Sequence, residues 1–344
     1  MSRLHEYRTA LLATCPDVAD EGLLGAIDVG GSQFASFIVD HGLGPQWHER
    51  TRRDEFYPSR MAAEALYLAQ EQALNEIAAV LDSAEIEYVL IKGAANRLLL
   101  YGNPAIRACH DLDFLVRPSD RLRAATIISD LSFVAAPEAR SIGRELVLTR
   151  RDICVDLHWT LLREGRLRFE VTSDMLSRRR KFGDLWILDA EDTLFTLLVH
   201  PAFTKHLAGW DMGLHRVMDI VEWIRTQDFD WNKVRERMQQ NGVRTAGWAA
   251  LRWVSLLIDP RMLPHLDEMM LSVRPGRIRR MWLDAWLKRN LSARTSNMHW
   301  VRLIGFTMFL HDTAGDSLRA IAGRLKARQR SDADIAVFQA LCDQ

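Results

Sequence analysis

Residues 88–116 read YVLIKGAANRLLLYGNPAIRACHDLDFLV. The run EYVLIKG is β-branched and aromatic and ends at a glycine, which predicts a buried strand. The run DLDFLV predicts a second strand. Because side chains alternate along a strand, Asp111 and Asp113 face one side of it while Leu112 and Phe114 face the other. Two like charges side by side on a half-buried strand persist most readily when a cation or a basic side chain neutralises them.

A third carboxylate lies further along the chain, in the strand-like run ICVDLHW. Asp156 is expected to share one face of that strand with His158, two residues later. Three converging carboxylates, Asp111, Asp113 and Asp156, would suit two Mg²⁺ (or Mn²⁺) ions about 3.5–4 Å apart, the arrangement used for in-line phosphoryl displacement. His158 has two interpretations: it helps to position Asp156 or a phosphate, or it packs beside Trp159.

The turn after the first strand predicts a phosphate site. Small residues, Gly93 and Ala94, follow the strand and begin a helix, so backbone N–H groups at a helix N-terminus are available to an anion. Lys92 precedes the turn and Arg107 lies four residues before Asp111, and both can hold phosphate oxygens.

The flanking sequence predicts an α+β fold with a small mixed sheet of about five strands. Ala, Leu, Glu and Gln dominate residues 59–84 and predict a long helix. Two more strands are expected at RELVLT and LWIL, and from Asp189 onward only helical periodicity continues. Segregation of the strands to the middle argues against βαβ alternation. We therefore expect N-terminal helices over 1–80, a catalytic core over 81–189 and a C-terminal helical domain over 190–344.

Charge is polarised along the chain although the total is zero. The sequence has 45 Lys+Arg and 45 Asp+Glu, which excludes a uniformly basic or acidic protein. Residues 271–330 hold 13 Lys+Arg against 3 Asp, or 13 − 3 = +10. This stretch is interpreted either as a solvated helical surface or as a contact for tRNA or another nucleic acid.

Cysteine usage and hydropathy predict a cytoplasmic location. The four cysteines, Cys15, Cys109, Cys154 and Cys342, are scattered and suggest no disulfide framework. The N-terminus lacks the unbroken apolar region of a signal peptide, and no run approaches the roughly 18 apolar residues of a membrane span.

Two residues of the C-terminal region are further candidates for nucleotide binding. Lys205 lies between His200 and His206 in a basic segment that is otherwise explained as a solvated helix end. Asp219 falls nearly opposite the apolar stripe of its predicted helix, so it faces either solvent or a cleft between domains.

The order strand–KG–helix, then R-x-x-x-D-x-D-x-L-V, then V-D-L-H-W resembles nucleotidyltransferases of the DNA polymerase beta-like superfamily. More narrowly, it is similar to a bacterial family of uncharacterised nucleotidyltransferases, over most of residues 60–260. The resemblance implies that Asp111 and Asp113 are metal ligands, that Asp156 is the third carboxylate and that Gly93 contacts the nucleotide phosphates. The superfamily favours Gly-Gly or Gly-Ser where this chain has Gly93-Ala94, which leaves a backbone contact to phosphate but no hydroxyl contact.

The leading hypothesis is metal-dependent nucleotidyl transfer. A hydroxyl or phosphate of a peptide, sugar or small molecule would attack the α-phosphate of an NTP, and pyrophosphate would leave. Asp156 is the candidate for activating this acceptor. The alternatives are a toxin-type enzyme that modifies tRNA and a catalytically degenerate nucleotide-binding module, against which the complete set of carboxylates argues. The sequence predicts neither the base, the acceptor nor the oligomeric state.

Overall fold

The computed structural model describes residues 3–12, 31–135, 145–208, 213–259, 262–263 and 265–323. By its internal contacts the chain forms two compact units. The helical unit comprises Met1–Glu64, Leu100–Ala108 and Leu197–Asp312, and the sheet unit comprises Ala65–Leu99, Cys109–Thr196 and Thr313–Gln344. Each unit is thus assembled from separated stretches of sequence. The division at residues 80 and 189 stays a prediction.

The sheet unit contains one mixed sheet with the strand order β3-β4-β5-β2-β1-β7-β6. The strands are β1 (Tyr88–Ile91), β2 (Asp111–Val116), β3 (Val134–Ala135), β4 (Glu145–Arg150), β5 (Ile153–His158), β6 (Arg180–Phe182) and β7 (Leu185–Ile187). β2 runs parallel to β5 and β1 runs parallel to β7, whereas the other neighbouring strands are antiparallel. The α+β class is therefore confirmed.

The expected number of about five strands is wrong, because the sheet has seven. The five expected runs form β1, β2, β4, β5 and β7. The two others are edge strands of two and three residues, too short to show an alternating pattern. All three residues of β6 are exposed, and the strand joins β7 through a two-residue turn in which Gly183 takes φ +58°. A Gly-Asp pair between short strands is a hairpin signal that the sequence did offer.

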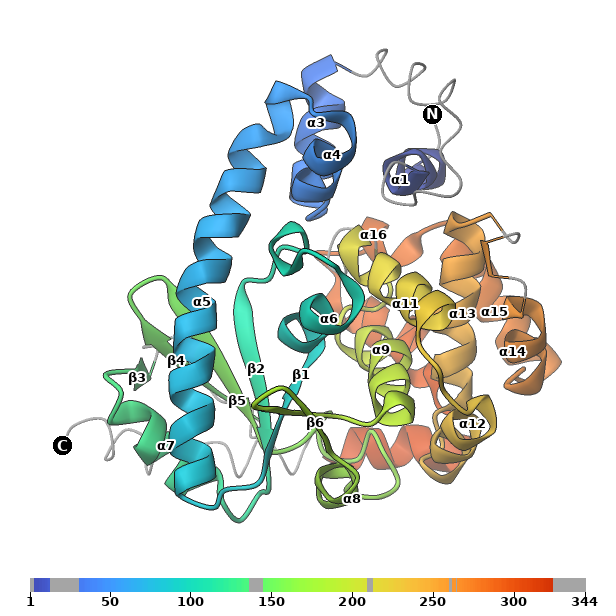
Figure 1. Cartoon of the computed structure of the whole chain (residues 1–344). Helices are drawn as coiled ribbons and strands as arrows, with labels where there is room; N and C mark the ends of the chain where they lie inside the picture. The colour runs from blue at the N-terminus through green and yellow to red at the C-terminus, as the bar shows by residue number, and fades with distance from the viewer. Residues whose placement is uncertain are drawn as a thin grey trace. The chain divides into compact units, whose positions relative to one another are not determined.

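One face of the sheet packs against the long helix α5 (Tyr57–Ser83) and against α7 (Arg121–Ser129), as Figure 1 shows. Leu74, Ile77 and Leu81 repeat at helical spacing along α5 and are buried in this core. On β2, Leu112 and Phe114 belong to the same core. Their alternate neighbours on β2 therefore point to the other face of the sheet, as predicted.

The described residues beyond Asp189 form helices and no strand, as predicted. Asp189 caps α9 (Ala190–Thr204) by accepting a hydrogen bond from the backbone N–H of Asp192 at 2.6 Å. Helices α5, α6 (Lys92–Leu100) and α9 contribute to both units, and α8 (Thr172–Ser177) belongs to the sheet unit. The other helices are α1 (Arg3–Leu12), α3 (Gly31–Asp40), α4 (Gly44–Thr51), α11 (Leu214–Thr226), α12 (Trp231–Gln240), α13 (Arg244–Leu257), α14 (Leu266–Ser272), α15 (Arg277–Lys288), α16 (Leu291–Arg294) and α17 (His299–Gly305), with 3₁₀ turns η2 (Asp54–Phe56), η3 (Pro104–Ile106) and η5 (Thr307–Leu310).

Two general expectations from the sequence concern membrane spans and disulfides. None of the helices in the described ranges is long and apolar enough to cross a bilayer. Cys109 and Cys154 are free thiols. Cys15, Cys342 and the last four basic residues of the 271–330 stretch lie outside the described residues.

Candidate active site

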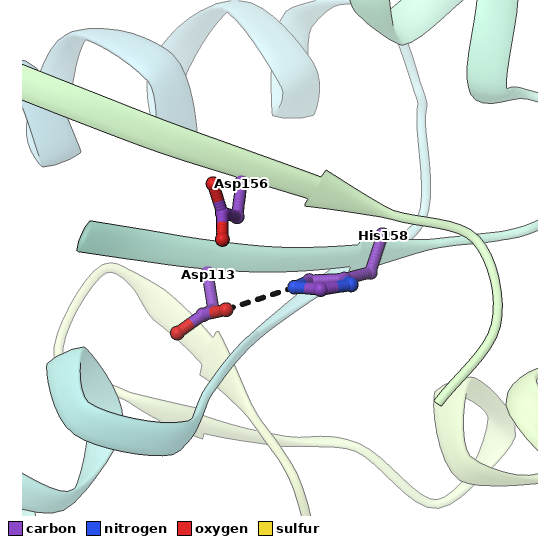
Figure 2. Close-up of side chains that lie close together, drawn as sticks. All are labelled: Asp113, Asp156 and His158. Carbon is purple, nitrogen blue, oxygen red and sulfur yellow. Dashed lines mark hydrogen bonds and ion pairs between the residues drawn. The ribbon is translucent and has the colours of Figure 1, made fainter. Parts of the chain in front are cut away.

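The register of three strands places the candidate site. Asp113 lies opposite Asp156 across the parallel pair β2–β5, and opposite Ile91 across the antiparallel pair β1–β2. His158 follows Asp156 by two residues on β5, so it projects from the same face. The three side chains come together, as Figure 2 shows. They lie on the face of the sheet opposite α5, because Leu112 and Phe114 pack in the core with α5. This face of β2 and β5 was predicted from the alternation of acidic and apolar residues.

Asp113, Asp156 and His158 form a compact cluster of potential metal ligands. Each offers one ligand atom, and these atoms lie within 4.8 Å of one another. The Nε2 atom of His158 is 2.8 Å from Oδ1 of Asp113 (dashed line in Figure 2). Asp113 and His158 are each 1% exposed, whereas Asp156 is half-buried and hence open to a ligand. The cluster differs from the predicted trio because His158 stands where Asp111 was expected.

Asp111 begins β2 and is half-buried. It shares the face of Asp113, since the two are separated by one residue. The charge of Asp111 contributes to raising the pKa of Asp156, but the Asp111 carboxylate is outside the compact cluster. The role of Asp111 as a metal ligand stays a prediction.

Lys92 supplies the basic partner that the paired carboxylates require. Its Nζ atom is 2.6 Å from Oδ1 of Asp113 and 2.8 Å from Nε2 of His158. Lys92 is also the first residue of α6, with φ +54°, a left-handed conformation that is costly for a side chain other than glycine. The turn was expected to depend on Gly93, but the unusual backbone lies at Lys92.

Glu145 completes a row of polar side chains that sequence reasoning missed. It pairs with His158 across the antiparallel strands β4 and β5, and its Oε2 atom is 3.0 Å from Nδ1 of His158. The imidazole of His158 therefore lies between Glu145 and Asp113. The run RELVLT predicts β4, but the contact depends on the register of β4 with β5, which no local pattern specifies.

The two carboxyl groups of the cluster have different electrostatic environments. Burial alone would raise the pKa of Asp113, but the nearby Lys92 ammonium and His158 outweigh it and hold that pKa well below its usual range. Burial, followed by the charges of Asp113 and Asp111, raises the pKa of Asp156 to about 6. Asp156 therefore retains the charge repulsion that a bound cation would relieve.

Cys154 shares the site face, two residues before Asp156. Burial, reinforced by the charge of Asp156, raises the pKa of the Cys154 thiol to about 12. In the metal-free chain the thiol is therefore protonated at neutral pH and is a poor nucleophile.

The remaining predicted nucleotide-binding residues lie in the helical unit. Asp219 is 0% exposed and accepts from Nη2 of Arg107 at 2.6 Å, from Nε of Arg107 at 3.2 Å and from the Tyr101 hydroxyl at 3.0 Å. The solvent-facing interpretation of Asp219 is wrong, because α11 is buried around most of its circumference. Lys205 is half-buried directly after α9. The nucleotide-binding roles of Arg107, Asp219 and Lys205 stay predictions.

A family model described as "Uncharacterised nucleotidyltransferase" matches residues 38–259, which is more than half of the chain. The chain belongs to this nucleotidyltransferase family. The matched region of the chain includes Lys92, Glu145 and all three members of the cluster. Comparisons of the chain with curated proteins and with solved structures found no match.

Proposed function

We propose that this chain transfers a nucleoside monophosphate from an NTP to a hydroxyl or phosphate of a peptide, sugar or small molecule, with release of pyrophosphate. We further propose that it is a bacterial member of the DNA polymerase beta-like superfamily and acts in the cytoplasm. The observation that carries the proposal is the Asp113–Asp156–His158 cluster on adjacent parallel strands, with Lys92 beside it at a strand–helix turn. Family membership supports the reaction class.

The residues of the cluster fit a divalent cation. Two carboxylate oxygens and one imidazole nitrogen within 4.8 Å of one another form a donor set that Mn²⁺ accepts, and the carboxylates also suit Mg²⁺. Asp113 and Asp156 would hold the ion, and Asp111 would help to hold a second one. Such ions would neutralise phosphate charge and align the attacking and leaving oxygens.

The chain's own residues would bind and orient the NTP. The N–H groups of Gly93 and Ala94 belong to the first turn of α6, which favours the negative charge of a phosphate. Lys92, whose side chain already reaches the site face, would contact the same phosphates. Asp113 would stay ionised throughout the reaction, because Lys92 and His158 favour its charged form.

Asp156 is the residue proposed to act on the acceptor. A general base works best when its pKa lies near the operating pH, and in the metal-free chain the pKa of Asp156 is raised to about 6. At neutral pH the carboxylate is mostly ionised and can take the proton that an acceptor hydroxyl loses. Its half-buried position leaves it accessible from solvent.

The test is an incubation of the purified chain with each labelled NTP, Mg²⁺ or Mn²⁺ and a total cell extract, followed by fractionation of the labelled product. Asp113→Ala should reduce transfer at least about 100-fold, since it removes a group that acts on transition-state charge. Asp152→Asn is the matched control, because Asp152 is exposed just before β5. Full transfer by Asp113→Ala would refute the assignment. Binding of an NTP in titration calorimetry without any transfer would favour the degenerate nucleotide-binding module instead.

A further inference from the structure

The solvent face of α15 carries apolar and basic side chains without an exposed carboxylate. Ile278 is 83% exposed, Met281 is 59% exposed and Trp282 is 44% exposed. At about 100° per residue these positions fall in one sector of the helix, together with the exposed Arg277 and Lys288. The opposite side, with Leu283, Trp286 and Leu287, is buried. The helix therefore has apolar side chains on two sides: one side packs in the core, and the other is exposed to solvent.

The neighbouring helix α17 extends this exposed set. Trp300 is 64% exposed and Ile304 is 59% exposed. The two helices are in contact, since the Trp282 indole N–H donates to the backbone carbonyl of Gly305, the residue after Ile304. Several large apolar side chains exposed on adjacent elements are typical of an interaction surface.

A hollow of about 360 Å³ lies at the edge of this surface, and Met281 belongs to both. Arg274 and Arg280 line the hollow beside Met270 and Leu271. Within the described ranges, the guanidinium groups of Arg274, Arg277 and Arg280 have no carboxylate partner. Two acidic residues also line the hollow: Asp284, which Arg252 and Lys288 neutralise at 2.6 and 2.7 Å, and Asp267.

We infer that this surface, defined by Arg274, Arg277, Ile278, Met281 and Trp300, binds the anionic surface of a lipid bilayer. Ile278, Met281 and Trp300 would enter the boundary between head groups and acyl chains, and the arginines would contact lipid phosphates. Exposed tryptophan and cations around apolar side chains are the features of helices that lie in that boundary.

The apolar side chains favour lipid over the other anionic partners. RNA would engage the arginines through its phosphates but would leave Ile278 and Met281 in water. An acidic protein would need hollows shaped for these outward-pointing side chains, whereas a fluid lipid boundary accepts them without a matching shape. The inference is independent of nucleotidyl transfer, because it concerns residues of the helical unit alone.

The test is co-sedimentation of the full chain, without NTP, with vesicles of phosphatidylcholine alone and of phosphatidylcholine mixed with phosphatidylserine. Wild-type chain should bind only the mixed vesicles, and binding should weaken with salt. Ile278→Asp combined with Met281→Asp should lower the partition coefficient at least about tenfold. Arg274→Gln and Arg277→Gln should each lower it about fivefold.

Leu68→Asp is the matched control, since Leu68 is a 59% exposed apolar residue of α5 in the sheet unit. It should bind mixed vesicles as wild type does. Equal binding by wild type and the Ile278/Met281 variant, or no binding of wild type to mixed vesicles, overturns the inference. An RNA complex that depends on the arginines but not on Ile278 overturns it in favour of nucleic acid, and a concentration-dependent dimer abolished by the same variants overturns it in favour of self-association. Thermal unfolding of each variant verifies that the fold is retained.

Discussion

Asp113 and Asp156 lie directly opposite each other on parallel strands, yet their environments shift their pKa values in opposite directions. The difference arises from Lys92 and His158, which both contact Oδ1 of Asp113. One carboxyl group is held ionised, and the other titrates near neutrality. Two carboxyl groups whose pKa values differ in this way can take different roles, one in binding a cation and the other in proton transfer.

The first prediction concerns Asp156 and the pH dependence of stability. The pKa of Asp156 is raised in the folded chain to about 6 from an ordinary 3.8, so its contribution to stability is full below the unfolded pKa and is lost as the pH rises through 6. In the metal-free chain at pH 8, ionised Asp156 should cost about 3 kcal/mol. Asp156→Asn should therefore raise the unfolding free energy at pH 8 but not at pH 4.

Urea unfolding of the metal-free chain at the two pH values measures this difference. Asp152→Asn, at an exposed position just before β5, should show no such pH dependence. A stability gain for Asp156→Asn that is the same at both pH values would show that charge repulsion is not its cause.

The second prediction concerns Lys92 as the resident counter-ion of Asp113. In Lys92→Met the buried Asp113 loses its closest cation, so the metal-free chain should lose about 3 kcal/mol of stability. The same variant should bind Mn²⁺ more tightly in the absence of nucleotide, because no ammonium competes for Oδ1 of Asp113. Nucleotidyl transfer should fall, since the proposed phosphate contact is gone.

Calorimetric titration of Lys92→Met and Lys92→Arg with Mn²⁺ tests this competition. Lys92→Arg keeps the charge and should bind Mn²⁺ about as wild type does. Weaker Mn²⁺ binding by Lys92→Met would mean that Lys92 supports the metal site instead of competing with it.

The third prediction concerns Glu145, which contacts His158 on the side opposite Asp113. Residues that orient a ligand typically contribute about 10- to 100-fold to metal affinity or activity. Glu145→Gln should therefore lower Mn²⁺ affinity about tenfold, and His158→Ala should lower it further. If Glu145→Gln changed neither Mn²⁺ affinity nor turnover, the contact would only stabilise the β4–β5 edge.

The fourth prediction separates a structural from a nucleotide-binding role for Arg107. Arg107→Met leaves Asp219 buried without its cation and should cost about 3–5 kcal/mol. Adding Asp219→Leu should recover most of that loss. With stability restored, an unchanged KM for NTP would assign the pair a purely structural role, whereas a raised KM would support the predicted contact with nucleotide.

Alternation along single strands made part of the site predictable from the sequence. It assigned Asp111 and Asp113 to one face of β2, and it put His158 on the face of Asp156. The contacts of Lys92 and Glu145 were not predictable, because they depend on a left-handed residue and on strand register.

Burial of α11 was missed for a related reason. One apolar stripe was evident, but packing on its other sides is set by distant segments, including the loop that carries Arg107. A charged residue can be buried when a partner from elsewhere in the chain neutralises it. Asp219 and Arg107 neutralise each other in this way.

The register of β2 against β5 has a consequence for how this family can vary. The same alternation that places Leu112 and Phe114 in the core places Asp113 on the opposite face. A single inserted or deleted residue in β5 would exchange the two faces of the strand, turning Asp156 toward α5 and Leu157 toward the candidate site. Substitutions can therefore change either face separately, but the lengths of these two strands are fixed by the core and the site together.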